Sequence, residues 1–264
     1  MKVIALVKAP KDPEAAAQVL ARESGTTLAE ARMRLAPEPP ALLARLVPEA
    51  TDAIADRLRA GGLQALAIST QPAPGRTRVK SVDFQPNLVR FLPRAGEALE
   101  IPFGDIAAIL RGISAVTTES ETIEKQKKLN WGATLAGLPM QKTVTRTVRS
   151  ETEDIENAIY VYAADGRCAV LRELSMELAW LGKALQPSRT ANMMLIARML
   201  RERAPGAFYD ERLVRLGRRP VPFLALGESQ VSSKAGTTTT QDTSSVLDLL
   251  AEALFQGVRQ RMLP

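Results

Sequence analysis

The sequence contains no histidine among its 264 residues. This excludes Ser-His-Asp and Cys-His catalysis, histidine general bases, and the histidine ligands of most zinc sites. The single cysteine, Cys168, cannot form an intramolecular disulfide bond or a thiolate cluster, which fits a reducing compartment. Because it lies in an apolar, strand-like segment (168–171), we expect a buried and inert thiol rather than a nucleophile.

Long apolar runs and aromatic residues are also scarce. No segment approaches the ~20 apolar residues that a membrane span needs, and the apolar stretch at residues 3–7 is too short for a signal peptide. We therefore expect a cytoplasmic protein without a membrane span. Hydrophobic residues make up 45% of the chain but aromatic residues only 4%, so the core should be mainly aliphatic. The net charge of +6 is compatible with an anionic partner without identifying one.

The first 69 residues have the pattern of a small α/β domain. Residues 3–7 predict a strand, and Asp12 followed by Pro13 predicts the start of a helix. Gly25 is a natural left-handed cap at the end of that helix.

Two more helices and a strand are expected in the same domain. A capping-box pattern, Thr27 to Glu30, predicts a helix that reaches about residue 35, where a proline-rich stretch ends it. A third helix is expected over residues 50–60, with Thr51 as a candidate cap, and a strand over residues 63–69.

These residues resemble a known family. The glycine at 25, the sequence Leu-Ala-Glu-Ala-Arg at 28–32, the proline break, and Ala-Ile-Ala-Asp-Arg-Leu-Arg-Ala-Gly-Gly at 53–62 look like the C-terminal domain of the bacterial ribosomal stalk protein. The resemblance implies a compact α/β fold and a surface that docks translation GTPases. The family's docking face uses basic residues on the first helix, where this chain has Gln18 and alanines; Arg32 matches one basic position on the second. The resemblance therefore implies the fold and a docking surface, but no binding residue. Alanine-rich helical pairs of this length are also common elsewhere.

A proline- and glycine-containing linker is expected at residues 70–77, followed by a β-rich domain at residues 78–227. A hairpin turn is expected at Asp165–Gly166, and a long helix over residues 189–203 with Ser188 as its cap. The candidate strands cover residues 82–84, 88–92, 99–103, 106–113, 144–149, 155–163, 167–174 and 178–181. The chain is thus expected to be α+β, with an antiparallel sheet or partial barrel closed by a helix, an element order like that of pleckstrin-homology domains.

The C-terminal part contains two segments of different composition. Residues 228–244 are rich in Ser, Thr and Gly and predict a flexible linker. Residues 245–264 predict an amphipathic helix, with Ser245 and Asp248 in a capping-box pattern. We expect its apolar stripe to dock on its own chain or in the groove of a protein partner, with a membrane surface as a third alternative. The stripe contains Leu247, Leu250, Leu254 and Val258.

Two sets of charged residues are candidates for chemistry or binding. One is a group of carboxylates around residues 119–124 and 151–156, expected in solvated loops. The other is the arginine-rich stretch at residues 189–219, which could form a solvated or ion-paired surface, or could bind nucleic acid, an acidic protein or a lipid headgroup. The arginines taken as candidates for partner binding are Arg189, Arg198, Arg201, Arg215 and Arg218.

The sequence has no phosphate-binding glycine loop and no metal-ligand cluster. We therefore expect a non-enzymatic protein-interaction or adaptor protein, with no catalytic residue, metal site or cofactor. Two alternatives stay open. One is a nucleic-acid-binding protein that uses residues 189–219. The other is an enzyme that uses carboxylates or a metal ion.

Overall fold

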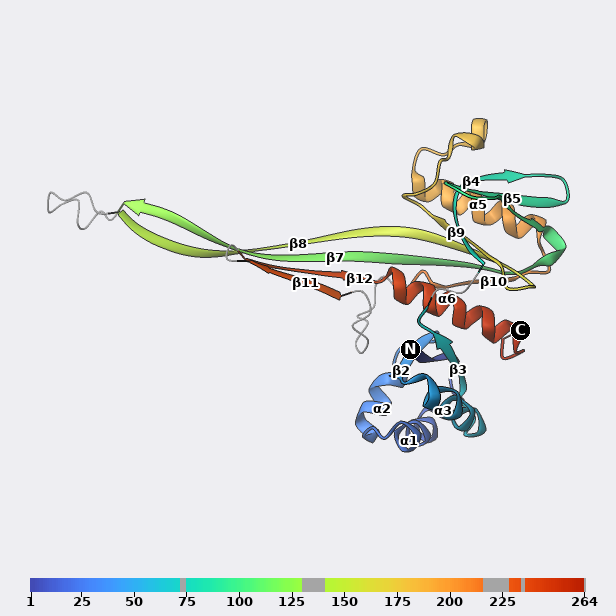
Figure 1. The fold of residues 1–264 in the computed structure, drawn as a ribbon, viewed down its shortest axis with the longest axis horizontal. Helices are drawn as coiled ribbons and strands as arrows, with labels where there is room; N and C mark the ends of the chain where they lie inside the picture. The colour runs from blue at the N-terminus through green and yellow to red at the C-terminus, as the bar shows by residue number, and fades with distance from the viewer. Residues whose placement is uncertain (72–74, 130–140, 216–227, 234–235, 264) are drawn as a thin grey trace.

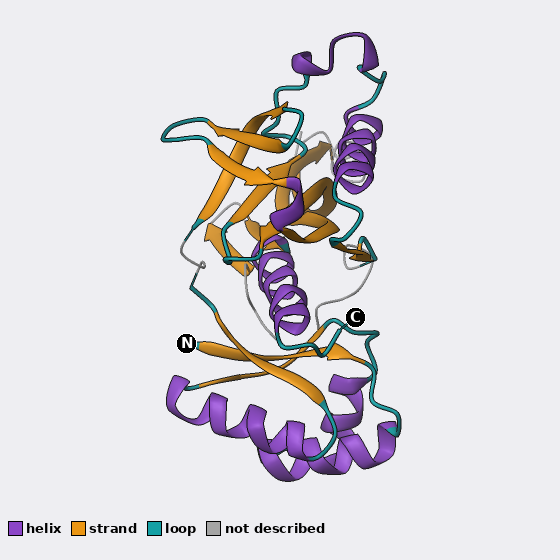
Figure 2. Cartoon of the chain, turned by 90° about the vertical axis from the view of Figure 1, so that its right-hand side faces the viewer, coloured by secondary structure: helices purple, strands orange, loops and turns teal. Residues whose placement is uncertain are grey.

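The computed structural model describes residues 1–71, 75–129, 141–215, 228–233 and 236–263. It contains two sheets with helices packed on them, which confirms the predicted α+β class. Helix α6 (Ser244–Arg259) lies between the two sheets, and a long β-hairpin extends away from both of them (Figures 1 and 2).

The smaller sheet is antiparallel, with strand order β2-β1-β3. Three helices cover one of its faces and enclose an aliphatic core that includes Ile4, Leu20, Leu43 and Leu58. The elements of this domain are β1 (Lys2–Lys8), α1 (Pro13–Ser24), α2 (Leu28–Leu35), β2 (Ala41–Leu46), α3 (Pro48–Ala60) and β3 (Gln64–Ser69).

The local signals of the first two helices act as predicted. The Asp12 carboxylate accepts hydrogen bonds from the backbone N–H groups of residues 14 and 15, both at 3.0 Å. Gly25 ends α1 at φ 68°, a conformation that costs a residue with a Cβ more than it costs glycine. Thr27 and Glu30 form both halves of the capping box of α2.

Two details of this domain were predicted wrongly. Strand β2 was missed, because a short segment after three prolines carries little periodic signal; it gains its stability by pairing with β1. Helix α3 begins at Pro48 rather than near residue 50, and Val47 is its N-cap. Thr51 does not cap the helix; its hydroxyl donates to the Val47 carbonyl at 2.7 Å.

The larger sheet has the strand order β11-β12-β7-β8-β9-β4-β5-β6, and β10 pairs in parallel with β7. The expected linker is shorter than predicted, because β4 already starts at Arg76; residues 72–74 lie outside the described part. The elements up to β9 are β4 (Arg76–Phe84), β5 (Leu88–Pro93), β6 (Leu99–Pro102), η1 (Phe103–Asp105), β7 (Ile106–Leu129), β8 (Gln141–Ala163) and β9 (Cys168–Arg172). The later ones are η2 (Ala179–Ala184), α5 (Arg189–Arg203), β10 (Phe208–Leu213), β11 (Glu228–Ser233) and β12 (Gly236–Asp242).

Helix α5 covers one face of this sheet and has the predicted bounds. Its cap is also as predicted, since the Ser188 hydroxyl accepts from the Ala191 N–H at 3.1 Å. The predicted turn at Asp165–Gly166 joins β8 to β9, with Gly166 at φ 96°. The candidate strand at residues 178–181 is instead part of the 3₁₀ helix η2.

The most extended feature is the hairpin of β7 and β8, which continues well beyond the sheet (Figure 1). We call residues 113–129 and 141–157 the arm. At about 3.3 Å per residue, its β7 strand is roughly 55 Å long. The expected flexible linker at 228–244 is wrong: β11 and β12 form a hairpin there, and β12 pairs with β7 from Val116 to Thr122. Threonine has a high propensity for strands, which fits the Thr-rich sequence of β12. The strand with which β12 pairs, β7, lies more than 100 residues earlier in the sequence.

Helix α6 joins the two sheets. Leu247, Leu250 and Leu254 are fully buried in a cluster that includes residues of β1, β3, β7, β8 and β9, and Val258 packs against the same cluster. These side chains, which were candidates for binding a partner, fill the chain's own core. The docked alternative for this helix is therefore the one observed. Gly112 allows close packing here, since a Cβ at that position would lie 2.5 Å from Leu247 Cδ1.

Cys168 is 1% exposed, and burial raises the pKa of its thiol to about 12. Because each pKa unit is a factor of ten, roughly a thousandfold less thiolate exists at pH 8 than for a thiol with the ordinary pKa. We expect a thiol reagent to label the native protein at least ~100-fold more slowly than the protein in 6 M guanidinium. A stopped assay with Ellman's reagent measures both rates, and Cys168→Ala gives the blank. Complete labelling of native protein within minutes would contradict this.

Candidate functional site

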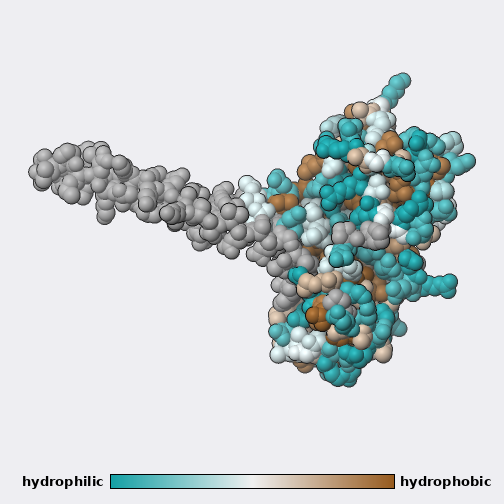
Figure 3. All heavy atoms as spheres, in the orientation of Figure 1, coloured by the Kyte–Doolittle hydropathy of each residue, from teal (hydrophilic) through white to brown (hydrophobic). Residues whose placement is uncertain are grey.

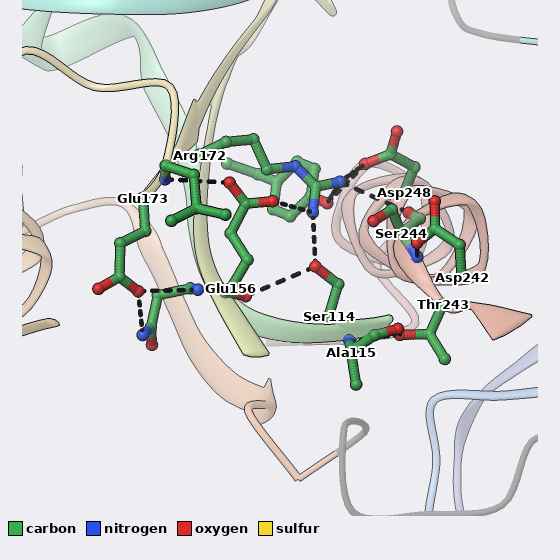
Figure 4. Close-up of polar contacts among 12 residues, drawn as sticks. Ser114, Ala115, Glu156, Arg172, Glu173, Asp242, Thr243, Ser244 and Asp248 are labelled. Carbon is green, nitrogen blue, oxygen red and sulfur yellow. Dashed lines mark hydrogen bonds and ion pairs between the residues drawn. The ribbon is translucent and has the colours of Figure 1, made fainter. Parts of the chain in front are cut away.

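A buried polar cluster ties α6 to the larger sheet (Figure 4). Arg172, at the end of β9, donates to Asp248 Oδ1 of α6 at 2.7 Å and to the Tyr160 hydroxyl at 3.1 Å. The Tyr160 hydroxyl donates to the same carboxylate oxygen at 2.6 Å. Burial, opposed by the charge of Arg172, raises the pKa of Tyr160 well above its ordinary value. The tyrosine therefore stays a hydrogen-bond donor. Asp248 was predicted to cap its own helix, but its carboxylate binds the sheet instead.

Arg76, the first residue of β4, completes this cluster. Its guanidinium lies 3.1 Å from Asp248 Oδ2 and 3.6 Å from Glu252. Burial alone would lower the pKa of Arg76, but the acidic groups around it, Tyr162 and Asp248 foremost, raise it above its ordinary value. One carboxylate of α6 thus holds two largely buried guanidinium groups from two strands.

A cleft of about 710 Å³ opens beside this cluster. Three arginines line it, Arg76, Arg78 and Arg172, and so do three carboxylates. The carboxylates are all bonded within the chain: besides Asp248, Glu156 accepts from the Leu174 N–H at 3.1 Å and Asp242 accepts from the Ser244 N–H at 2.8 Å. Because three positive charges balance three negative ones, and each carboxylate is already bonded within the chain, we interpret the cleft as a structural junction rather than a catalytic centre.

The candidate arginines do not converge on one surface. Arg189 donates to the backbone carbonyls of residues 173 and 176. Arg198 lies 3.8 Å from Glu202 on α5, and Arg201 stacks over the Tyr209 ring at 4.7 Å. Arg215 pairs with Glu38 of the smaller domain at 3.0 Å. Arg218 lies outside the described residues. Each of the four described candidates thus has a partner within the chain, which argues against a shared phosphate-binding face.

The candidate carboxylates lie in strands, so the prediction that they occupy loops is wrong. Both groups belong to the arm, one on β7 and one on β8, and the strand register places them side by side. In that register Glu121 is opposite Arg149, Glu124 is opposite Arg146, and Glu119 is opposite Glu151.

The arm also presents an open strand edge. Strand β8 pairs with β7 along its whole length, but on its other side it pairs only with β9, from Ala158 to Tyr162. On the same side, the Asn157 carbonyl accepts from the Glu173 N–H at 2.9 Å, which continues this pairing by one residue. In the described part of the chain, no strand pairs with that side of β8 over residues 141–156. A strand edge of this kind exposes a row of backbone N–H and C=O groups that can pair with another strand. Nothing in the local sequence pattern marked this edge, because it depends on which strands pair.

The strands at the ends of the two described sheets, β2, β3, β6 and β11, are shorter, at four to six residues each. On the face seen in Figure 3, hydrophobic residues are scattered among hydrophilic ones. Within the described ranges, none of the helices combines the length and apolarity needed to cross a membrane.

No protein-family model matches this chain, and neither a curated protein nor a solved structure shows significant similarity to it. The compact α/β fold of residues 1–69 is present, but its relation to the ribosomal stalk family remains a prediction. The same holds for the pleckstrin-homology-like element order of the larger domain.

Proposed function

We propose that this chain is a non-enzymatic protein-interaction protein, an adaptor or assembly component, that binds a partner through the open edge of β8 (Gln141–Ala163). The observation that carries the proposal is the free side of β8 along residues 141–156, on an arm that projects beyond the packed cores. Addition of a strand to an exposed sheet edge is a common mode of protein recognition. A cytoplasmic location, which the single buried cysteine fits, is part of the proposal.

The arm contributes little to the described cores. The core cluster under α6 reaches this hairpin only as far as Leu110 on β7 and Ala158 on β8. A projection of this length that is not needed to bury the core is most simply explained by contacts outside the molecule. The arginines of residues 189–215 mostly bond within the chain, so the nucleic-acid alternative has less support.

A shortened arm tests the proposal. Thr122 and Val148 are directly opposed in the hairpin, so residues 123–147 can be replaced by a two-residue Asn-Gly turn that suits such a pair. We expect the melting temperature to change by less than about 4 °C, because surface changes away from the core shift stability little. We expect protein partners captured from a nuclease-treated lysate to be lost.

The full chain with the exposed pair Arg94→Glu and Lys183→Glu is the matched control, and it should keep its partners. Capture that is equal for the full and shortened chains would contradict the proposal. In a lysate without nuclease, capture of nucleic acid alone, released by moderate salt, would also contradict it and would favour the arginine-rich region instead.

A further inference from the structure

Charged residues are segregated along the arm. Its outer part, residues 125–129 and 141–149, contains six basic residues and no acidic one. Its inner part, residues 117–124 and 150–156, contains seven acidic residues and no basic one. The basic residues are Lys125, Lys127, Lys128, Lys142, Arg146 and Arg149. The acidic residues are Glu119, Glu121, Glu124, Glu151, Glu153, Asp154 and Glu156. On each strand of the arm, the charge therefore changes sign only once.

Strand β8 carries this polarity along its open edge. A second β8 strand placed antiparallel to the first would bring its basic half beside the acidic half of its neighbour. A parallel copy would bring like charges together, which is unfavourable. We propose that the partner of the arm is a second copy of this chain, and that two arms pair antiparallel along their β8 edges about a two-fold axis beside Ser150.

This register places opposite charges at the positions nearest the axis. Arg149 of one copy lies opposite Glu151 of the other, and Arg146 lies opposite Asp154. The two-fold axis repeats both pairs, as in any isologous interface. The strands overlap over residues 144–156, which corresponds to about 43 Å of continuous pairing at ~3.3 Å per residue.

Charges on an open edge can also serve to keep other strands away. An edge of a single sign would repel any copy of itself. The segregated charges of β8 repel only a parallel copy and attract an antiparallel one. Ile155 supports an occupied edge as well, because it is 56% exposed in an otherwise polar segment. In the proposed register it lies opposite Thr145 of the second copy.

This inference rests on the proposed function, since it names the partner of the same edge. The first test is sedimentation velocity of the full chain between about 1 and 100 µM. At low salt we expect a monomer–dimer equilibrium that weakens in 1 M NaCl, where the Debye length falls to ~3 Å. A chain that stays monomeric at 100 µM and low salt would overturn the inference. An arm-dependent partner in the lysate experiment would still support the proposed function.

Charge reversal tests the register. The variant Arg146→Glu/Arg149→Glu has only acidic residues at the four paired positions, and the variant Glu151→Arg/Asp154→Arg has only basic ones. We expect each variant alone to dimerise roughly 100-fold more weakly than the wild type, because each substitution acts twice. An equimolar mixture should form a heterodimer at least as tightly as the wild type.

The mixture separates loss of pairing from damage to the arm. Reversal of Arg149 also places two acidic residues opposite each other within one hairpin, because position 149 is opposite Glu121. Mixing the two variants cannot repair that effect. A mixture that fails to associate would therefore overturn the proposed register. The variant Arg94→Glu/Lys183→Glu changes the net charge as much as Arg146→Glu/Arg149→Glu does, and it should dimerise like the wild type.

A cysteine at the axis gives an independent readout. In the proposed register Ser150 faces Ser150 of the second copy, and directly opposed Cα atoms of antiparallel strands are ~4.5–5.5 Å apart. That separation suits a disulfide bond, so Ser150→Cys should give a covalent dimer under mild oxidation. Ser120→Cys is the matched control, since it pairs with Ser150 in the same hairpin and its other side is covered by β12. Its two copies would be about 14 Å apart, three strand spacings. Equal cross-linking of both variants, or of neither, would overturn the pairing.

Discussion

A chain that ends at Asp242, and so lacks α6, is expected not to fold cooperatively. Removal of this helix exposes the inner face of the smaller sheet and one face of the larger sheet at once, because both pack on it. Five of its buried side chains carry most of the effect: Val246, Leu247, Leu250, Leu254 and Phe255. At about 1.5–3 kcal/mol each, their burial contributes on the order of 10 kcal/mol, which is as large as the whole stability of a typical domain.

Thermal unfolding followed by near- and far-ultraviolet circular dichroism measures the effect. We expect the truncated chain to bind a hydrophobic dye and to show no sharp transition. In the full-length chain, Leu250→Ala should lower the free energy of unfolding by about 3 kcal/mol. Gln260→Ala, at the exposed end of α6, should change it by less than about 0.5 kcal/mol.

A truncated chain that keeps the wild-type melting temperature would contradict the expectation. In that case α6 would not be needed for the fold. This would agree with the prediction from sequence of a helix on a flexible linker that binds a partner. Addition of a synthetic peptide of residues 243–263 provides a positive control, because it should restore a cooperative transition if the remaining chain is otherwise able to fold.

The elements that sequence alone predicted well are those whose signals are local. These signals act through atoms only a few residues away: they bond free backbone N–H groups at the start of a helix, as at Asp12, Thr27 and Ser188, or end the helix, as at Gly25. Such interactions need no knowledge of the fold. The bounds of α5 were therefore predicted correctly, and the turn at Asp165–Gly166 was also recognised.

The errors share a physical cause, which is long-range pairing. Strands β11 and β12 lie in polar, Thr-rich sequence, and they form a hairpin that is held against β7 more than 100 residues earlier in the chain. The capping-box pattern at Ser245 was misleading for the same reason, because Asp248 makes stronger contacts with Arg172 and Arg76 across the interface. A local sequence pattern cannot predict whether a side chain will instead bond a residue that is distant in the sequence and near only in the folded chain.

The candidate site shows the same limit. The acidic and basic residues of the arm were visible in the sequence, but the carboxylates were assigned to loops, and only residues 144–149 and 155–157 of the arm's β8 strand were predicted as strand. Their separation by sign was available without a structure and could have been noticed. The separation of charges can be related to binding only when β7 and β8 are known to form one hairpin and the side of β8 away from β7 is known to be open.

The second large effect is expected at Asp248. Its replacement by alanine removes the carboxylate that Arg172 and Arg76 share, while both guanidinium groups remain largely buried, at 13% and 12% side-chain exposure. Removal of one partner from a fully buried ion pair costs about 3–5 kcal/mol. Because Asp248 itself is 29% exposed, we expect a smaller loss of about 2–3 kcal/mol in the free energy of unfolding.

Urea unfolding of four proteins separates the contributions. Tyr160→Phe removes one hydrogen bond to the carboxylate and should cost about 1 kcal/mol. Asp56→Ala removes a helical aspartate that pairs with Arg59 on the surface, and it should cost less than about 1 kcal/mol. In the double variant Asp248→Ala/Arg172→Met, part of the loss should be recovered, because one of the two guanidinium groups that lose the Asp248 carboxylate is gone. If Asp248→Ala cost no more than Asp56→Ala, the cluster would not be what fixes α6 to the larger sheet. The apolar contacts of the helix would then have to account for its position alone.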